Sequence, residues 1–185
     1  MEEQHYAFQE WVKLRKASKN LRLYALVDGI QYDRAIGEEL KREKGVYPLL
    51  SQPEDKAILF AGPWLLDINI LPEDYLLKLR KLETESPAVS WIISEYDVLP
   101  LAHHLENGMI VTLPSKQAGL FRFYDCRVLQ KITALLSQEQ LALLIQEMTR
   151  WIFYHEGKTH CYQYDDGYFS IKVLENNSAD KETLS

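Results

Sequence analysis

The chain has 185 residues, of which 46% are hydrophobic, and a net charge of −6, which suits a globular domain with a core of its own. The negative charge argues against nucleic acid as a partner, because the protein as a whole is not drawn to phosphate backbones. No run approaches the ~18 apolar residues of a membrane span, the N-terminus lacks signal-peptide features, and two cysteines do not make a disulfide framework. We therefore expect a cytoplasmic protein without a membrane partner.

The N-terminal part of the chain predicts two helices and one buried strand. Residues 23–28 are mostly apolar and predict the strand. Asp33 is a candidate cap for a polar helix that runs to about Lys44, and Gly45 would end that helix as a C′ residue. An amphipathic helix at the N-terminus is predicted by apolar positions near helical spacing: Phe8, Trp11, Val12 and Leu14.

The middle of the chain alternates strands with helices. Strands are predicted over residues 64–68 and 89–93 from their apolar content. A helix opens at Pro72, where a proline and two acidic residues suit the first turn, and a shorter helix is predicted over residues 98–105.

A hairpin and a capped helix follow. Residues 109–113 and 120–124 flank a loop that contains proline and glycine, which predicts a β-hairpin. Asp125 then suits an N-cap, because its carboxylate can accept hydrogen bonds from the first free amides of a helix. The apolar positions from Val128 to Leu136 recur at three- and four-residue spacing and predict that helix.

The C-terminal elements are a further helix and two strands. Ser137 and Gln140 form a capping box that starts the helix. The strands are predicted over residues 152–164 and 168–174, and Asp165-Asp166-Gly167 between them is a strong turn signal.

Strands that alternate with helices predict an α/β layered domain. The hairpin at 109–124 would add antiparallel pairing to its sheet, so we expect a mixed β-sheet flanked by helices, plus a C-terminal helical pair and β-hairpin. We expect residues 1–124 to form the α/β core. Residues 125–175 would form the helical pair and terminal hairpin, either within the same domain or as a small lobe. The polar residues 176–185 predict a disordered tail.

Four segments of the chain are similar to a known family when they are taken in this order and at these separations. They are Leu23-Tyr24-Ala25-Leu26-Val27-Asp28-Gly29, Ala61-Gly62-Pro63-Trp64-Leu65, His104-Leu105, and Leu120 through Leu129. Across residues 20–150 they resemble the type VI secretion effector-chaperone family, also called the adaptor family. The most specific of them is the Phe-Arg-Phe-Tyr-Asp-x-Arg-Val-Leu string within residues 120–129.

The resemblance implies a non-catalytic cytoplasmic protein of Gram-negative bacteria that needs no cofactor. Members of the family bind a toxic effector through its loading domain and load it onto the VgrG spike protein. Many members have an extended helical C-terminal region, whereas here a hairpin is expected soon after Trp151. Partner contacts made through that region are therefore not carried over to this chain.

The resemblance also singles out side chains that either bind a partner or hold the fold together. Arg122, Asp125 and Arg127 would lie at the partner surface, or Asp125 would cap its helix while an arginine pairs with it or with Asp28. Tyr124 lies in the same string. Two tryptophans are further candidates, because tryptophan is common at binding hot spots. They are Trp64, for which a core position at the start of a strand is the commoner explanation, and Trp11 on the terminal helix, which is the better interface candidate.

Catalytic and metal sites are not predicted. Glu95, Asp97 and His103 or His104 could form an acid/base site, but nothing in the sequence brings them together, and no phosphate loop or nucleophile elbow is present. His160 and Cys161 would point to opposite faces of one strand, which argues against a shared metal ion.

Two other functions stay open from the sequence. A small hydrolase or nucleotide-binding domain is supported only by the alternation of strands and helices, which many functions share. An immunity protein that neutralises a toxin is compatible with the net charge of −6. The oligomeric state cannot be read from the chain.

Overall fold

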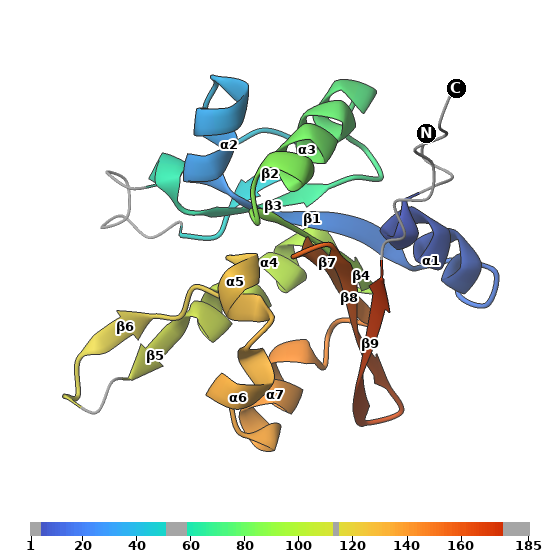
Figure 1. The fold of residues 1–185 in the computed structure, drawn as a ribbon, viewed down its shortest axis with the longest axis vertical. Coiled ribbons are helices and arrows are strands. Elements are labelled where there is room, and N and C mark those ends of the chain that lie inside the picture. The colour runs from blue at the N-terminus through green and yellow to red at the C-terminus, as the bar shows by residue number, and fades with distance from the viewer. Residues whose placement is uncertain (1–4, 51–58, 113–114, 176–185) are drawn as a thin grey trace, which may run out of the picture.

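The computed structural model describes residues 5–50, 59–112 and 115–175, so the predicted tail at 176–185 lies outside the described residues. Its centre is a seven-stranded sheet in the order β2-β3-β1-β4-β7-β8-β9 (Figure 1). The strands are β1 (Arg22–Asp28), β2 (Val46–Pro48), β3 (Pro63–Asp67), β4 (Val89–Ser94), β7 (Arg150–His155), β8 (Lys158–Asp165) and β9 (Tyr168–Glu175).

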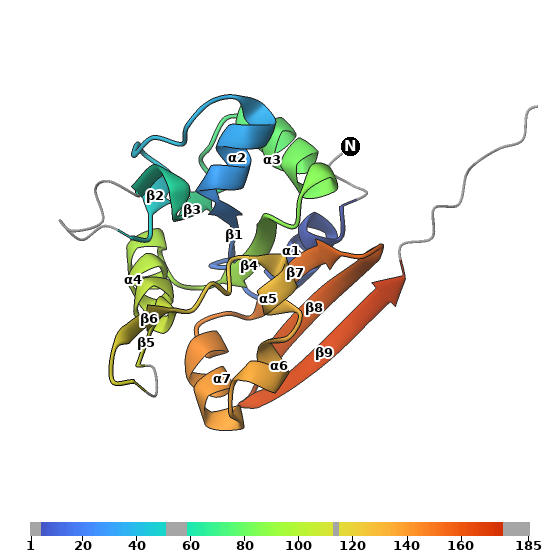
Figure 2. The ribbon, with the colours of Figure 1, turned by 60° about the vertical axis from the view of Figure 1, so that its left-hand side comes forward.

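Helices cover both faces of this sheet (Figures 1 and 2). One face carries α1 (Tyr6–Arg15), α2 (Gly29–Ile36) and α3 (Glu73–Glu85). The other carries α4 (Val98–Met109), α5 (Cys126–Leu129), α6 (Ile132–Leu135) and α7 (Gln138–Ile145). A single turn, η3 (Leu59–Ala61), precedes β3. The α/β layered class predicted from the sequence is therefore confirmed.

The predicted mixed sheet is wrong, because every pairing in the seven-stranded sheet is antiparallel. Alternating strands and helices favour parallel neighbours when the crossover joins adjacent strands. Here α3 joins β3 to β4, and these two strands lie on either side of β1. The crossover therefore skips a strand that runs the opposite way.

Strand β1 is apolar from Leu23 to Val27 because both of its faces are buried. Tyr24 and Leu26 contribute to the core beneath α4–α7, while Leu23, Ala25 and Val27 contribute to the core beneath α1–α3. Strands of a sheet covered on both sides lose the usual alternation of polar and apolar residues. The same two-sided burial holds for β3 and β4, where every residue is buried.

Several element predictions are confirmed, including the N-terminal helix, the α3 helix, the Ser137 capping box of α7 and the turn at Asp166-Gly167. The predicted helix over residues 33–44 is wrong. The observed helix α2 begins at Gly29, because Asp28 at the end of β1 already supplies the cap. It ends at Ile36, because Gly37 follows with a φ of +82° in the left-handed conformation.

Two further predictions near residues 120–129 need correction. The helix after Asp125 is broken into the short helices α5 and α6. The hairpin predicted over 109–124 is shorter, comprises β5 (Ile110–Thr112) and β6 (Ala118–Leu120), and forms a separate sheet; residues 113 and 114 lie outside the described residues. After Leu120 the chain turns inward, which buries Phe123 and Tyr124, and α4 extends to Met109.

The C-terminal strands continue the same sheet. β7 pairs with β4 from Ser90 to Ile93. The predicted core, residues 1–124, and the C-terminal residues 125–175 therefore contribute strands to one sheet. The Tyr162 hydroxyl of β8 donates a hydrogen bond of 2.8 Å to the carbonyl of Leu129 in α5. Within the residues that the structure describes, no helix combines the length and apolar character needed to cross a membrane.

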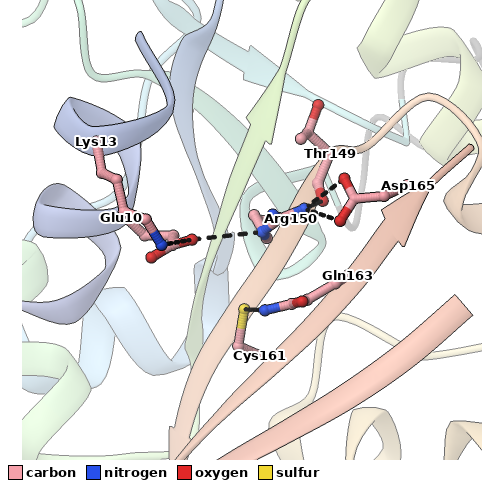
Figure 3. Close-up of polar contacts among 7 residues, drawn as sticks. All are labelled: Glu10, Lys13, Thr149, Arg150, Cys161, Gln163 and Asp165. Atoms are coloured by element: carbon pink, nitrogen blue, oxygen red, sulfur yellow. Dashed lines mark hydrogen bonds and ion pairs between the residues drawn. The ribbon is translucent and has the colours of Figure 1, made fainter. Parts of the chain in front are cut away.

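A buried ion network fastens α1 to the C-terminal strands (Figure 3). Arg150 of β7 lies between Glu10 of α1 and Asp165 of β8, with its Nε 3.6 Å from Glu10 Oε1 and its Nη1 2.8 Å from Asp165 Oδ1. Arg150 and Glu10 are both buried, so solvent screens neither charge and each is compensated by its ion-pair partners. Lys13 also approaches Glu10, at 3.5 Å, but its side chain is exposed.

Replacing Glu10 by alanine should lower the free energy of unfolding by about 3 kcal/mol, because Arg150 keeps a buried charge with one fewer partner. Lys13→Ala is the matched control and should change it by less than ~0.5 kcal/mol, since the lysine is exposed. Urea unfolding of the three proteins measures both values. Equal effects of the two substitutions would contradict the structural role given to the buried pair.

Candidate functional site

The predicted signature residues gather where β1 ends and β4 begins. Asp28 is the last residue of β1, and its amide donates a hydrogen bond of 2.9 Å to the carbonyl of Ala88. The Asp28 carboxylate accepts hydrogen bonds from the amides of Ile30 and Gln31 at 3.1 and 3.2 Å, and so caps α2. Burial raises the pKa of Asp28 above its usual value despite these hydrogen bonds.

Gly29 brings two of the similar segments into direct contact. Its amide donates to the carbonyl of Gly62 at 2.9 Å. A Cβ atom at this position would lie only 2.2 Å from the carbonyl oxygen of Phe60 and 2.6 Å from that of Gly62. The indole of Trp64 closes the same junction, because its Nε1 donates to the Phe60 carbonyl at 3.3 Å. Trp64 is fully buried, so its indole is part of the core.

Asp125 holds the start of α5. Its Oδ1 accepts a hydrogen bond of 2.9 Å from the amide of Arg127, and both carboxylate oxygens accept from the Arg127 guanidinium, at 2.9 Å from Nε and 2.7 Å from Nη2. Burial alone would raise the pKa of Asp125, but the hydrogen bonds from Arg127 outweigh it and leave that pKa below its usual value. The next amide, of Cys126, donates to the carbonyl of Pro87 at 3.1 Å and ties this turn to the start of β4.

Arg122 connects Asp28 to the Tyr124 ring. Its Nη2 lies 3.6 Å from Asp28 Oδ2, and its guanidinium lies 5.3 Å from the centre of the Tyr124 ring. Tyr124 is buried, which raises the pKa of its hydroxyl. We call the five residues Asp28, Arg122, Tyr124, Asp125 and Arg127 the signature cluster.

The signature cluster presents positive charge above buried negative charge. The side chains of Arg122 and Arg127 are 51% and 62% exposed, whereas the two carboxylates below them are almost entirely buried. The arginines thus have a structural contact on one side and solvent on the other. This arrangement lets a guanidinium bind an acceptor of another molecule without leaving its own carboxylate.

Trp11 lies away from the signature cluster. Its indole Nε1 donates to the carbonyl of Leu21 at 3.1 Å, next to the beginning of β1, whereas Asp28 ends that strand. The Arg15 guanidinium covers the ring at 4.9 Å. Trp11 is half-buried, so part of its ring remains at the surface of α1.

The residues of the hypothetical acid/base site are divided among other contacts. Glu95 accepts from the Ser18 hydroxyl at 2.5 Å, Asp97 pairs with Arg22 at 2.9 Å, and the ring of His104 lies 2.7 Å from the carbonyl of Leu144. Glu95 and Asp97 do line one open polar pocket, and neither histidine is among its lining residues.

The candidate metal ligands His160 and Cys161 have separate surroundings. His160 stacks on Phe153, and Cys161 is buried in the core under α1–α3. In residues 5–50, 59–112 and 115–175, no three His, Cys, Asp or Glu side chains are placed to hold one metal ion.

The projecting β5–β6 hairpin is a candidate surface that the sequence did not reveal. Figures 1 and 2 both show it extending away from the layered body. Ile110 and Leu120 face each other across it and remain 60% and 43% exposed. Sequence alone placed these residues in the main sheet, where they would be buried, so their exposure had no signal. Leu120 directly precedes the Phe-Arg-Phe-Tyr-Asp segment that contains Arg122, Tyr124 and Asp125.

The fold is a three-layer α/β sandwich, and the signature cluster lies where β1 ends and where α2 and α5 begin. Residues 23–143 of the chain match the family model described as domain of unknown function DUF4123, and the chain belongs to that family. Domains of this family occur in type VI secretion effector adaptors. Nothing among curated proteins or solved structures matches this chain.

The Gly29 junction should not accept a side chain. Gly29→Ala would force the carbonyls of Phe60 and Gly62 away, so we expect a loss of about 3 kcal/mol of stability or failure to fold. The control is Gly167→Ala, where a Cβ meets nothing within 4 Å and only the φ of +83° opposes it, at about 1–2 kcal/mol. Thermal unfolding compares the two variants, and a milder effect at Gly29 would contradict this geometry.

The two buried carboxylates should have opposite pH dependence. Asp125→Asn should cost about 1–2 kcal/mol at neutral pH through the lost pair with Arg127. Because the pKa of Asp125 is lowered in the folded state, its contribution is lost as the pH falls through that pKa, and the variant should approach the parent protein.

For Asp28, whose folded pKa is raised, the parent protein gains stability as the pH falls through that pKa and the buried carboxylate is protonated. The Asp28→Asn variant lacks this gain, so its stability relative to the parent protein should decrease as the pH is lowered. Urea unfolding over a series from neutral to acidic pH measures both trends. A common direction for the two variants would show that Arg127 does not determine the behaviour of Asp125.

Proposed function

We propose that this protein is a non-catalytic adaptor that binds a type VI secretion effector and loads it onto the VgrG spike. The observation that carries the proposal is membership of the DUF4123 family over residues 23–143, because domains of this family occur in effector adaptors. The matched residues include the whole signature cluster and the β5–β6 hairpin.

The proposed effector-binding surface combines the hairpin with the exposed arginines beside it. Ile110 and Leu120 supply exposed apolar area on a projecting element, and apolar residues of this kind mark binding surfaces on folded domains. Arg122 follows β6 by two residues and offers a guanidinium whose buried partners hold it in place. A partner surface with an apolar centre and carboxylates around it would fit this combination.

The mechanism needs binding alone. The adaptor would recognise the loading domain of the effector, keep it in a complex in the cytoplasm, and release it when the spike is assembled. The layered sandwich supplies the scaffold for this surface, because Arg122, which follows the hairpin, pairs with Asp28 at the end of β1. A pre-organised surface lowers the entropy lost on association.

The test is a tagged pull-down from the encoding bacterium during active secretion, with bound proteins identified by mass spectrometry. We expect recovery of one effector and a spike protein, and loss of effector secretion after clean deletion of the gene. Unchanged secretion in the deletion strain would refute the adaptor role. Recovery of a toxin's catalytic domain without its loading domain would instead indicate an immunity protein.

The surface itself is tested by Ile110→Lys, which places a charge in the exposed apolar area of the hairpin. We expect at least a ~10-fold weaker interaction with the effector, as for an interface hot spot. The matched control is Leu143→Lys on α7, where the leucine is 62% exposed but lies on another element. Equal binding by both variants would exclude the hairpin as the effector surface.

A further inference from the structure

The two edges of the seven-stranded sheet differ in how they are protected. At one edge, β2 has only three residues and contains Pro48, a residue that cannot donate to a further strand. At the other, β9 has eight residues, Tyr168–Glu175, with no proline and no glycine. Figure 2 shows β9 along the outer margin of the sheet, and no described strand pairs with its outer side. A long unprotected edge of this kind is a template for pairing with another chain.

The turn before β9 determines which of its backbone groups point outward. Asp166 and Gly167 have positive φ values and join β8 to β9 as a two-residue hairpin turn, so Asp165 and Tyr168 form a hydrogen-bonded pair. Hydrogen-bonded and non-bonded pairs alternate along an antiparallel ladder. The amides and carbonyls of Phe169, Ile171 and Val173 therefore point away from β8, toward the open edge.

The same three residues carry the apolar side chains of one face. Ile171 lies opposite Tyr162, and the Phe169 ring contacts the Tyr162 ring, so this face continues the core under α4–α7. Ile171 and Val173 nevertheless remain 45% and 47% exposed. On the other face, Lys172 lies over the ring of Tyr6 of α1. Apolar side chains thus coincide with main-chain groups that no strand of the described residues pairs with.

We propose that β9 pairs antiparallel with β9 of a second copy of this chain, with Ile171 on the twofold axis, and joins the two sheets into one. In this register Phe169 faces Val173 of the other copy and Ile171 faces its own symmetry mate. These are the residues with outward main-chain groups, so each pair exchanges both N–H···O bonds. On the opposite face, Tyr168 meets Leu174 and Ser170 meets Lys172.

The charges on β9 select this register over the neighbouring one. A shift that keeps the side chains on their faces moves the twofold axis by one residue, to Lys172 or to Ser170. With Lys172 on the axis, two lysines face each other and Phe169 faces Glu175. Like charges directly opposite each other destabilise a strand pair. With Ser170 on the axis, Val173 would lie opposite the turn residue Gly167 and lose its apolar partner. The register centred on Ile171 avoids both.

The first experiment measures self-association of the full chain by sedimentation across a concentration series. We expect a dimer that Ile171→Lys weakens at least ~10-fold, because two lysines then meet on the axis. The matched control is Val12→Lys on α1, where the valine is similarly exposed, and it should leave the dimer unchanged. Circular dichroism of each variant checks that the fold is retained.

A cysteine experiment tests the register without relying on a loss of association. Ile171→Cys should form a disulfide-linked dimer on mild oxidation, because the Cα atoms of a hydrogen-bonded pair lie ~5.5 Å apart. Val173→Cys should not, because its symmetry mate lies about four residues further along, or ~13 Å away. The native Cys126 and Cys161 are buried and should not compete.

Several outcomes would overturn the proposal. A parent protein that stays monomeric at every concentration would exclude the second copy as the occupant of β9. A dimer that Ile171→Lys leaves intact, or equal cross-linking of Ile171→Cys and Val173→Cys, would place the interface elsewhere or in another register. Capture of an extended effector segment by monomeric β9 would also refute self-pairing. The adaptor role is tested separately, since it does not depend on this edge.

Discussion

Gly29 lies so close to the carbonyl oxygens of Phe60 and Gly62 that no side chain fits between them. This contact joins the end of β1 to the segment that enters β3, and it sets the point at which the chain leaves the sheet to begin α2. Asp28, one residue earlier, completes the same corner by capping α2 and by its main-chain bond to Ala88. The position of the signature cluster follows from this corner, because Arg122 and the Asp125 turn pack onto it.

The signature cluster shows how structural and binding roles can share side chains. Two carboxylates are buried and satisfied by helix amides and arginines, and this fixes the arginines from below. Their outer faces remain in solvent, so a partner would meet cations that have already lost much of their rotational freedom. Loss of either acid would therefore change both the stability of the fold and the geometry of the surface, and the two effects need separate measurement.

Much of the layered fold could be predicted from the sequence, because burial and capping leave local patterns. The apolar run from Leu23 to Val27 indicated a buried strand, and the Ser137 capping box indicated the start of α7. The direction of neighbouring strands was not predictable in this way, since nothing local shows that α3 crosses over β1. The exposed hairpin was hidden for a similar reason: Ile110 and Leu120 resemble core residues until their separation from the main sheet is known.

The order of strands in the sheet also bears on how the protein is made. β1 lies between β3 and β4, so both of its hydrogen-bonding partners are synthesised after it. On the ribosome, the apolar residues of β1 emerge well before Trp64 or Ile92 exists to cover them. A nascent chain in this state exposes an apolar strand with two open edges, the condition under which newly made proteins aggregate or bind chaperones. A strand that is covered on both faces and paired at both edges in the finished protein thus lacks all of this protection early in its synthesis.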